Sequence, residues 1–316
     1  MRVVAAAAAD ARASCVPSRM PRVDDALRGG ARARHVTEIA GESASAKTTL
    51  CAQLAVSATA RGGACVYVST EGAPPVTLMR RIALSPRFVE DAFDGDVDAA
   101  RAALERVYVA KTLGDADALR ETLVALSAAL RAPVRDDAVV RMIVVDSIAA
   151  PFRDDEDDRG WTYAAKRAGA LHALAALLKE YATRHDVAVV VTNHVVDRAR
   201  DDGCTNDGDG AVATRAMGAF TTSGRRVTPA LGLMWSNCVN ARLVLTRRAT
   251  RESRGVGRVD GDDGADAVGR TLHVVFAPHL PEASVDFVVR EDGAWDVDAA
   301  NVDAANVDAA RAARVR

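Results

Sequence analysis

The feature that most constrains the fold of this chain lies between His35 and Arg61, where an apolar run precedes a small-residue loop and a helical pattern. His35–Ala40 predicts a buried strand, Gly41–Thr49 a loop, and the residues up to about Arg61 a helix. A loop at such a junction points backbone N–H groups outward beside the positive end of the helix dipole. The sequence therefore predicts a phosphate-binding loop in an α/β domain.

The residues of this loop form the candidate cofactor-binding site: Gly41, Glu42, Ser43, Ala44, Ser45, Ala46, Lys47, Thr48 and Thr49. Lysine is rare in this chain, and Lys47 stands where a side chain would reach the β- and γ-phosphates of ATP. The Thr48 hydroxyl would bind Mg²⁺. We therefore expect ATP and Mg²⁺ as cofactors. The alternative interpretation is an alanine- and serine-rich turn before a helix.

Ala46 stands where this kind of loop has glycine. If the position requires a left-handed backbone, alanine costs about 1–2 kcal/mol there. If it does not, alanine only reduces the room beside the nucleotide.

Two acidic residues that follow predicted strands are candidate catalytic groups. Asp146 ends the apolar strand Arg141–Val145, which is where a Walker B carboxylate orders magnesium and its waters. Glu71 follows the strand Ala64–Ser69, at the sheet edge where ligands of open α/β sheets bind, and could orient or deprotonate an attacking water. The alternatives are a turn or helix-capping aspartate and an exposed loop glutamate.

Apolar strand patterns alternate with helical patterns through the first two thirds of the chain. Beyond those named above, the expected elements are helices at Val76–Leu84, Ala99–Arg106, Asp115–Arg131 and Trp161–Arg184, and strands at Val107–Ala110 and Val187–Thr192. Because the strands are apolar throughout, we expect a mostly parallel central sheet flanked by helices.

The last third of the chain differs from the rest in composition and in hydrophobic pattern. Asp197–Thr228 is rich in Gly, Asp, Thr and Arg and predicts an irregular, functional or disordered stretch. Three strand-like runs follow, Ala241–Arg247, Arg270–Phe276 and Val285–Arg290, with a polar hairpin loop at Arg251–Gly269 between the first two. The fold class is therefore an α/β P-loop ATPase core with further, antiparallel strands at its C-terminal end.

Composition excludes several classes of protein. The five cysteines include no CxxC pair, which argues against a disulfide scaffold or a zinc module. The longest apolar runs are too short to cross a bilayer, so no membrane partner is expected. A net charge of −2 excludes a strongly basic nucleic-acid coat.

The two ends of the chain predict disorder. Residues 1–19 contain the alanine run Ala5–Ala9 without apolar periodicity and predict a disordered leader, with an organellar transit peptide as the alternative. Residues 294–316 contain the repeats DVDAA, NVDAA and NVDAA at Asp296–Ala310 and predict a low-complexity, disordered tail. The core is therefore expected over residues 20–293.

Several motifs, taken together and in order, resemble the RecA/RadA recombinase superfamily. They are MPRVDDALRGG at Met20–Gly30, STEG at Ser69–Gly72, IVVDSIAAPFR at Ile143–Arg153 and VVVTNHV at Val189–Val195. Other segments look like a eukaryotic recombinase paralogue of the X-ray-repair cross-complementing type: DSIAAPFR at Asp146–Arg153, TPALGLMWSN at Thr228–Asn237 and APHLPEAS at Ala277–Ser284. The resemblance covers about Met20–Gly293 and implies a RecA-like ATPase core.

The resemblance also implies roles for parts of the site. By position, Lys47 and Thr48 would hold phosphate and magnesium, Glu71 would activate water, and Asp146 would support the metal. It further implies ATP bound at a subunit interface, a role in homologous-recombination DNA repair and a location in the nucleus.

The same resemblance implies contacts with other macromolecules. Pro278–Pro281 would cover the nucleotide of a neighbouring subunit. The DNA-binding loops would correspond to about Asp154–Trp161 and Val196–Thr228.

Three features separate this sequence from a filament-forming recombinase. His194 stands where recombinases have a glutamine that senses the γ-phosphate. Asp154–Asp158 is an acidic run that would repel a phosphate backbone. The leader also has no Phe-x-x-Ala self-assembly segment.

We therefore expect an ATP-binding paralogue that forms a heteromer with another RecA-like recombinase paralogue and supports recombinase loading on single-stranded DNA, which it binds weakly alone. Hydrolysis is expected to be weak, because the phosphate loop departs from the motif. One alternative is an autonomous DNA-dependent ATPase that pairs strands itself, and another is an unrelated RecA-fold ATPase. Arginines in the second loop would permit DNA contact, but aspartates are interleaved with them.

Overall fold

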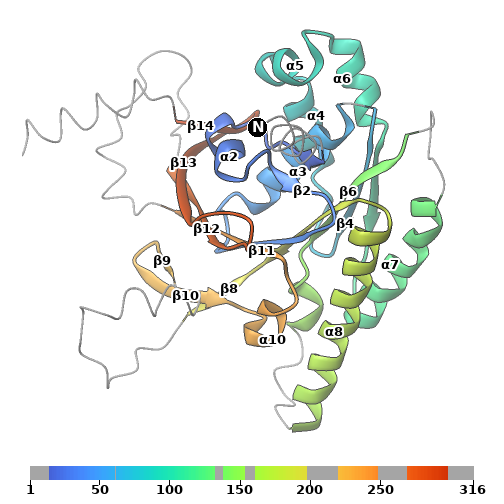
Figure 1. Ribbon diagram of the computed structural model, residues 1–316, viewed down its shortest axis with the longest axis vertical. Coiled ribbons are helices and arrows are strands. Elements are labelled where there is room, and N and C mark those ends of the chain that lie inside the picture. Colours follow the sequence, from blue (N-terminus) through green and yellow to red (C-terminus); the bar gives the residue numbers. More distant parts are fainter. Residues whose placement is uncertain are drawn as a thin grey trace, which may run out of the picture.

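A nine-stranded sheet runs through the centre of the molecule, with helices packed on both of its faces (Figure 1). The computed structural model describes residues 14–60, 62–131, 138–153, 161–197, 220–247 and 269–297. From one edge to the other, the strands are β14 (Gly293–Asp296), β13 (Ala283–Arg290), β12 (Gly269–Phe276), β11 (Ala241–Arg247), β3 (Val36–Gly41), β7 (Ala188–Asn193), β6 (Val140–Asp146), β4 (Ala64–Ser69) and β5 (Val107–Lys111).

The sheet has a parallel part and an antiparallel part. Neighbouring strands from β11 through β3, β7, β6 and β4 to β5 are parallel. The strands β11, β12, β13 and β14 pair in antiparallel fashion. The predicted α/β architecture, a mostly parallel sheet with antiparallel strands near the C-terminus, is therefore confirmed.

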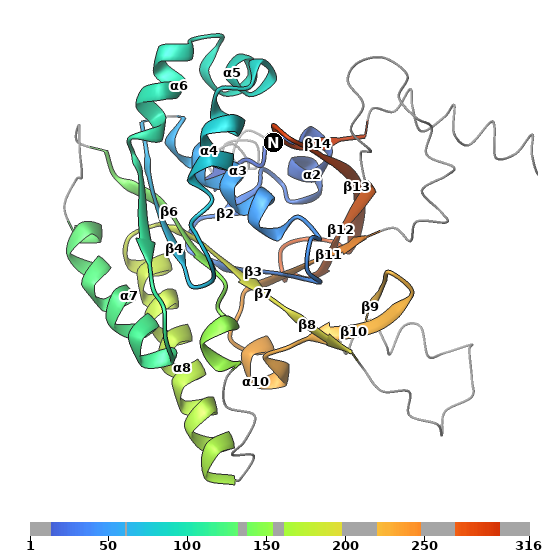
Figure 2. The same cartoon turned by 180° about the vertical axis from the view of Figure 1, so that it is seen from behind.

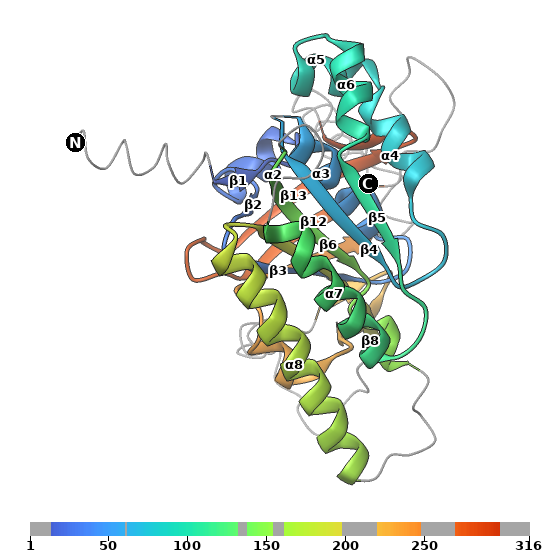
Figure 3. The same ribbon diagram turned by 90° about the vertical axis from the view of Figure 1, so that its right-hand side faces the viewer.

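Two groups of helices cover the two faces of this sheet (Figure 3). On one face lie α2 (Pro21–Ala26), α3 (Lys47–Thr59), α4 (Val76–Ala83), α5 (Pro86–Phe93) and α6 (Val97–Leu104). On the other lie α7 (Ala116–Arg131), α8 (Trp161–Arg184) and α10 (Gly232–Ser236). None of the helices in the described ranges is both long and apolar enough to span a membrane.

The continuous apolar runs of the sequence follow from this double cover. In β7, Val189 and Val191 pack in the core beneath α7 and α8, whereas Val190 packs on the opposite side beneath α3. All six residues of β7 are buried. A strand with both faces buried has no position for an exposed polar side chain, which is why alternation is absent.

The predicted boundaries of the core are wrong at both ends. Strand β1 (Cys15–Val16) falls within the predicted leader and pairs with β2 (Ala31–Arg32), while β14 extends into the predicted tail. The buried side chain of Gln53 in α3 holds both segments. Its amide nitrogen donates to the carbonyl oxygens of Ser18 at 2.6 Å and Ala294 at 2.9 Å. Compositional bias at the two ends therefore concealed short strands that add to the core. Residues 1–13 and 298–316 lie outside the described ranges.

Part of the stretch predicted to be irregular is ordered. Its ends form an antiparallel three-stranded sheet from β8 (Val195–Asp197), β10 (Arg225–Pro229) and β9 (Phe220–Thr222), which stands beside the main sheet (Figure 2). The amide of Arg247 donates to the Thr222 hydroxyl at 3.0 Å and joins this small sheet to β11. Strands this short carry too little periodicity to be recognised among Gly, Asp and Arg.

Helix α5 was missed and α6 begins earlier than predicted. Ser85 caps α5 by accepting from the amide of Phe88 at 3.3 Å, and Pro86 occupies the first helical position. Asp96 caps α6 by accepting from the amides of Asp98 and Ala99, each at 2.9 Å. Both signals are present in the sequence, as is Asp115, which caps α7 by accepting from the amides of Asp117 and Ala118.

Candidate functional site

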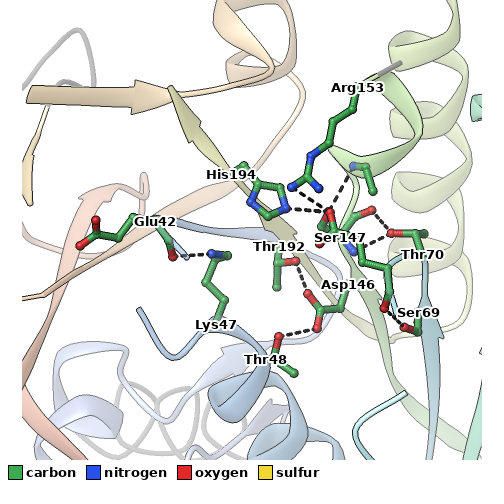
Figure 4. A network of polar contacts seen from close by, with 12 residues as sticks. Glu42, Lys47, Thr48, Ser69, Thr70, Asp146, Ser147, Arg153, Thr192 and His194 are labelled. Carbon is green, nitrogen blue, oxygen red and sulfur yellow. Dashed lines mark hydrogen bonds and ion pairs between the residues drawn. The ribbon is translucent and has the colours of Figure 1, made fainter. Parts of the chain in front are cut away.

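Four neighbouring strands bring the candidate residues to one edge of the sheet. In the order β3, β7, β6 and β4, they are parallel, so their carboxyl ends lie together. Lys47 follows β3, His194 follows β7 and Asp146 ends β6 (Figure 4). Glu71 follows β4. The structure thus places together the residues that the sequence assigned to one site.

The loop Gly41–Ala46 connects β3 to α3 and turns tightly at its start. A Cβ atom on Gly41 would lie 2.4 Å from the Ser45 hydroxyl oxygen and 2.7 Å from the carbonyl oxygen of Leu245. Since real Cβ atoms do not approach so closely, only glycine fits here.

Lys47, the first residue of α3, bends back over the loop. Its ammonium donates to the carbonyl oxygens of Gly41 and Glu42, both at 2.8 Å. Burial lowers the pKa of Lys47, while the charges of Asp146 and Glu71 oppose that shift. The ammonium is therefore positioned at the mouth of the loop, where a phosphate group would meet it.

Ala46 has a left-handed backbone, with φ +82° and ψ +18°. The sequence left open whether this position needs that conformation, and the structure shows that it does. Ala44 also has a positive φ, of +59°. Left-handed alanine costs roughly 1–2 kcal/mol, so the loop contains strain that glycine would not carry.

Asp146 is surrounded by hydroxyl groups. The hydroxyls of Thr48 and Tyr67 donate to its Oδ2 at 2.8 and 2.7 Å, and that of Thr192 donates to Oδ1 at 2.5 Å. These bonds orient both oxygens of the carboxylate beside the first turn of α3. Thr48 and Asp146 together thus present hard oxygen atoms next to Lys47, the kind of ligand that Mg²⁺ prefers.

Glu71 is held by three side chains from two other segments, those that follow β7 and β6. Its Oε1 lies 2.9 Å from His194 Nε2, 3.0 Å from the Ser147 hydroxyl and 3.0 Å from Arg153 Nη2. The hydrogen bond from His194 is the largest cause of a pKa lowered to about 2; burial opposes it, and Arg153 and Ser147 add to it. The carboxylate is therefore kept charged and weakly basic.

Glu42 connects the loop to the small sheet. Its Oε1 accepts from the hydroxyls of Thr222 and Ser223, each at 2.6 Å, and its Oε2 lies 3.2 Å from Arg225 Nη2. Burial would raise the pKa of Glu42, but these hydrogen bonds outweigh it and lower the pKa. The second residue of the phosphate loop is thereby linked to β9 and β10.

Several residues that complete the site were not predicted. Tyr67 and Thr192 lie inside predicted strands, and Ser147 and Arg153 lie inside a quoted motif without an assigned role. A buried tyrosine hydroxyl usually finds a partner, so Tyr67 was open to prediction. Of the proposed DNA-binding loops, residues 154–160 and 198–219 lie outside the described ranges, as do residues 251–268 of the predicted hairpin loop.

The residues of the loop fit a nucleoside triphosphate with Mg²⁺. The Ser45 hydroxyl is buried and has no hydrogen-bond partner in the described part of the chain, so a polar group remains to be satisfied inside the loop. No cluster of three or more His, Cys, Asp or Glu ligands occurs among the described residues. Mg²⁺ is commonly held by one or two protein oxygens together with substrate phosphates, which agrees with Thr48 and Asp146 alone.

Comparison with known proteins agrees with this geometry. The pattern of the Rad51 family matches residues 15–223. The chain is 29% identical over 293 residues to the DNA repair protein XRCC3 homolog of Arabidopsis thaliana, covering 88% of this chain and 91% of that protein. It is 30% identical over 282 residues to DNA repair protein XRCC3 of Mus musculus, covering 86% and 72%. It is 26% identical over 296 residues to DNA repair protein rhp57 of Schizosaccharomyces pombe, covering 87% and 77%.

Proposed function

Because the chain belongs to the Rad51 family, as a recombinase paralogue of the XRCC3 type, we propose that it is an ATP-binding subunit in homologous-recombination DNA repair. Its relatives are named as DNA repair proteins, which supports a role in the nucleus. We further propose that it pairs with another RecA-like paralogue, supports recombinase loading, and binds single-stranded DNA weakly alone.

In this proposal, Gly41–Thr49 hold the phosphates of ATP. The loop amides and the amino end of α3 favour negative charge, and Lys47 neutralises part of it. Thr48 and Asp146 hold Mg²⁺, directly or through water. When bound, the metal and nucleotide supply a triphosphate whose charge is partly neutralised and whose terminal bond is open to attack by water.

Glu71 is the residue that we propose orients that water. A general base works best when its pKa lies near the operating pH. The three contacts on one oxygen of Glu71 hold its pKa far below neutrality, which supports slow hydrolysis. The observation that carries the proposal is therefore a site in which Lys47, Thr48 and Asp146 lie around the phosphate loop, while Glu71, the carboxylate that we propose as catalytic, is strongly paired. This favours a subunit that binds ATP over an autonomous, fast ATPase.

Titration calorimetry with ATP and Mg²⁺ tests the proposal. The wild-type chain should bind, and Lys47→Ala should abolish binding because the buried ammonium beside the loop is lost. Lys111→Ala is the matched control, since Lys111 is exposed on the edge strand β5 and should leave affinity unchanged. Equal affinity in the wild type and Lys47→Ala would refute the assigned site.

A further inference from the structure

Arg270 of β12 reaches the phosphate loop from outside it. The residue is 7% exposed, and its strand pairs with β11 on one side and β13 on the other. Nε and Nη2 both donate to the carbonyl oxygen of Ala44, at 3.1 and 2.8 Å. Nη1 donates to the carbonyl of Gly269 at 3.2 Å, which fixes the plane of the guanidinium. One carbonyl in the middle of the loop is thus held by two charge-assisted hydrogen bonds.

Ala44, whose carbonyl oxygen Arg270 binds, has a backbone conformation that is unfavourable for alanine. Ala44 has φ +59° and Ala46 has φ +82°, and after Gly41 the loop contains no glycine. Alanine disfavours the left-handed region, so the loop alone would tend to relax toward other conformations. Strained backbone persists where the surrounding structure determines it from outside.

We propose that Arg270 is a positioning residue of the nucleotide site, which keeps a glycine-poor phosphate loop in its binding conformation through the carbonyl of Ala44. The inference rests on the proposed function and adds to it a residue from the antiparallel part of the sheet. It explains why a buried cation is placed here. An arginine in this position is stabilised only if its donors are satisfied, and its planar fork matches a single fixed acceptor.

A lysine could not fully replace it. A lysine ammonium is a compact point charge on a flexible stem, so it would donate to the Ala44 carbonyl without fixing its direction. The effect of Arg270 should also depend on the strain in the loop. With glycine at position 44 the left-handed conformation carries no penalty, and the external hold becomes less important.

Hydrogen exchange in the nucleotide-free chain tests the hold on the loop directly. The amide of Ser45 donates to the carbonyl of Glu42 at 3.3 Å, so exchange of the peptide over residues 42–46 reports whether the loop stays closed. Arg270→Gln should accelerate this exchange and weaken ATP binding in calorimetry, each by about tenfold, because charge-assisted hydrogen bonds are strong. Arg290→Gln, an exposed arginine on the neighbouring strand, is the control and should match the wild type.

The double variant separates a positioning role from general stability. In an Ala44→Gly background, Arg270→Gln should change exchange and affinity by less than about threefold. Equal losses in both backgrounds, or wild-type values for Arg270→Gln, would overturn the inference. If Arg270→Gln does not fold, Arg270→Lys is measured instead. This variant should show losses of loop protection and ATP affinity between those of the wild type and those expected for Arg270→Gln. Wild-type values for Arg270→Lys would overturn the inference. If the wild type binds no ATP, the proposed function fails, while exchange at residues 42–46 still decides whether Arg270 holds the loop.

Discussion

His194 Nε2 lies 2.9 Å from Glu71 Oε1, and this contact joins the carboxyl ends of β7 and β4, which are separated in the sheet by β6. Ser147, which follows β6, contacts both residues, with its hydroxyl 3.0 Å from Glu71 and 3.3 Å from His194. The carboxylate that we propose as catalytic is therefore in direct contact with His194. A change in His194 should be transmitted to Glu71 directly.

The low pKa of Glu71 gives a testable pH dependence. Its pKa falls from 4.5 to about 2 on folding, so the unfolded chain binds more protons between these values. The stability contributed by its contacts is then fully present above about pH 4.5 and is lost as the pH falls toward 2. Urea unfolding at several pH values should show a steeper acid loss in the wild type than in Glu71→Gln. Parallel pH profiles for the two chains would contradict the assigned pairing.

The left-handed backbone of Ala46 makes a prediction about stability and binding. Ala46→Gly should raise the free energy of unfolding by about 1 kcal/mol, because the strain of a left-handed alanine is removed. It should also tighten ATP binding. Ala52→Gly, inside the regular part of α3, is the contrasting control and should lower stability by about 1 kcal/mol. If Ala46→Gly destabilises the chain as Ala52→Gly does, the left-handed conformation is not the relevant one in solution.

The sequence was sufficient to predict elements whose signals are local. The strand, loop and helix from β3 to α3, the strand β6 ending in Asp146, and helix α8 all appear where their patterns placed them. The juxtaposition of Lys47, Glu71 and Asp146 also followed, because parallel strands end at a common edge. These predictions follow from hydrophobic periodicity and from the order of strands and helices, both of which can be read directly from the sequence.

The features of the site that the sequence did not predict depend on contacts between residues far apart in the chain, which no local pattern contains. Glu42 is 180 positions from Thr222, and Ala44 is 226 positions from Arg270. Gln53, which joins the two ends of the core, is likewise 241 positions from Ala294. The φ angle of Ala46 is likewise set by the contacts that hold the loop in the folded chain. From the sequence one can state the energetic cost of a left-handed alanine, but not whether Ala46 adopts that conformation.

The contact between Glu42 and the small sheet can be broken without touching Lys47. Thr222→Val removes a donor from a carboxylate that is 7% exposed, together with the acceptor of the Arg247 amide, and should lower the free energy of unfolding by about 1–3 kcal/mol. It should also raise the pKa of Glu42, because one of the hydrogen bonds that lowers it is lost. Thr221→Val, at the exposed neighbouring position, should stay within about 0.5 kcal/mol of the wild type. Urea titrations of both variants provide the measurement, and equal effects would show that the contact is unimportant.

The turn from Ala277 to Glu282 between β12 and β13 exposes two prolines on its outer side. The amide of Leu280 donates to the carbonyl of Ala277 at 3.1 Å, and the ring of His279 stacks on His35 with 4.8 Å between centroids. Pro278 and Pro281 are exposed. Inward-facing His279 and Leu280 thus fix the turn, while the prolines, whose φ is locked, form a rigid outer surface.

This arrangement predicts how the chain assembles. A nucleotide contacted by two subunits favours the assembled state by mass action, so ATP should strengthen pairing with the RecA-like partner that we propose. Pro278→Ala with Pro281→Ala should weaken that ATP-dependent pairing and leave the fold intact, because the residues that anchor the turn to the core remain. Sedimentation with a co-purified partner, with and without ATP, measures both effects, and Arg290→Gln serves as the surface control. The heteromer proposal would be refuted if the chain sediments as a monomer with every partner and nucleotide tested. In that case no second subunit would cover the nucleotide.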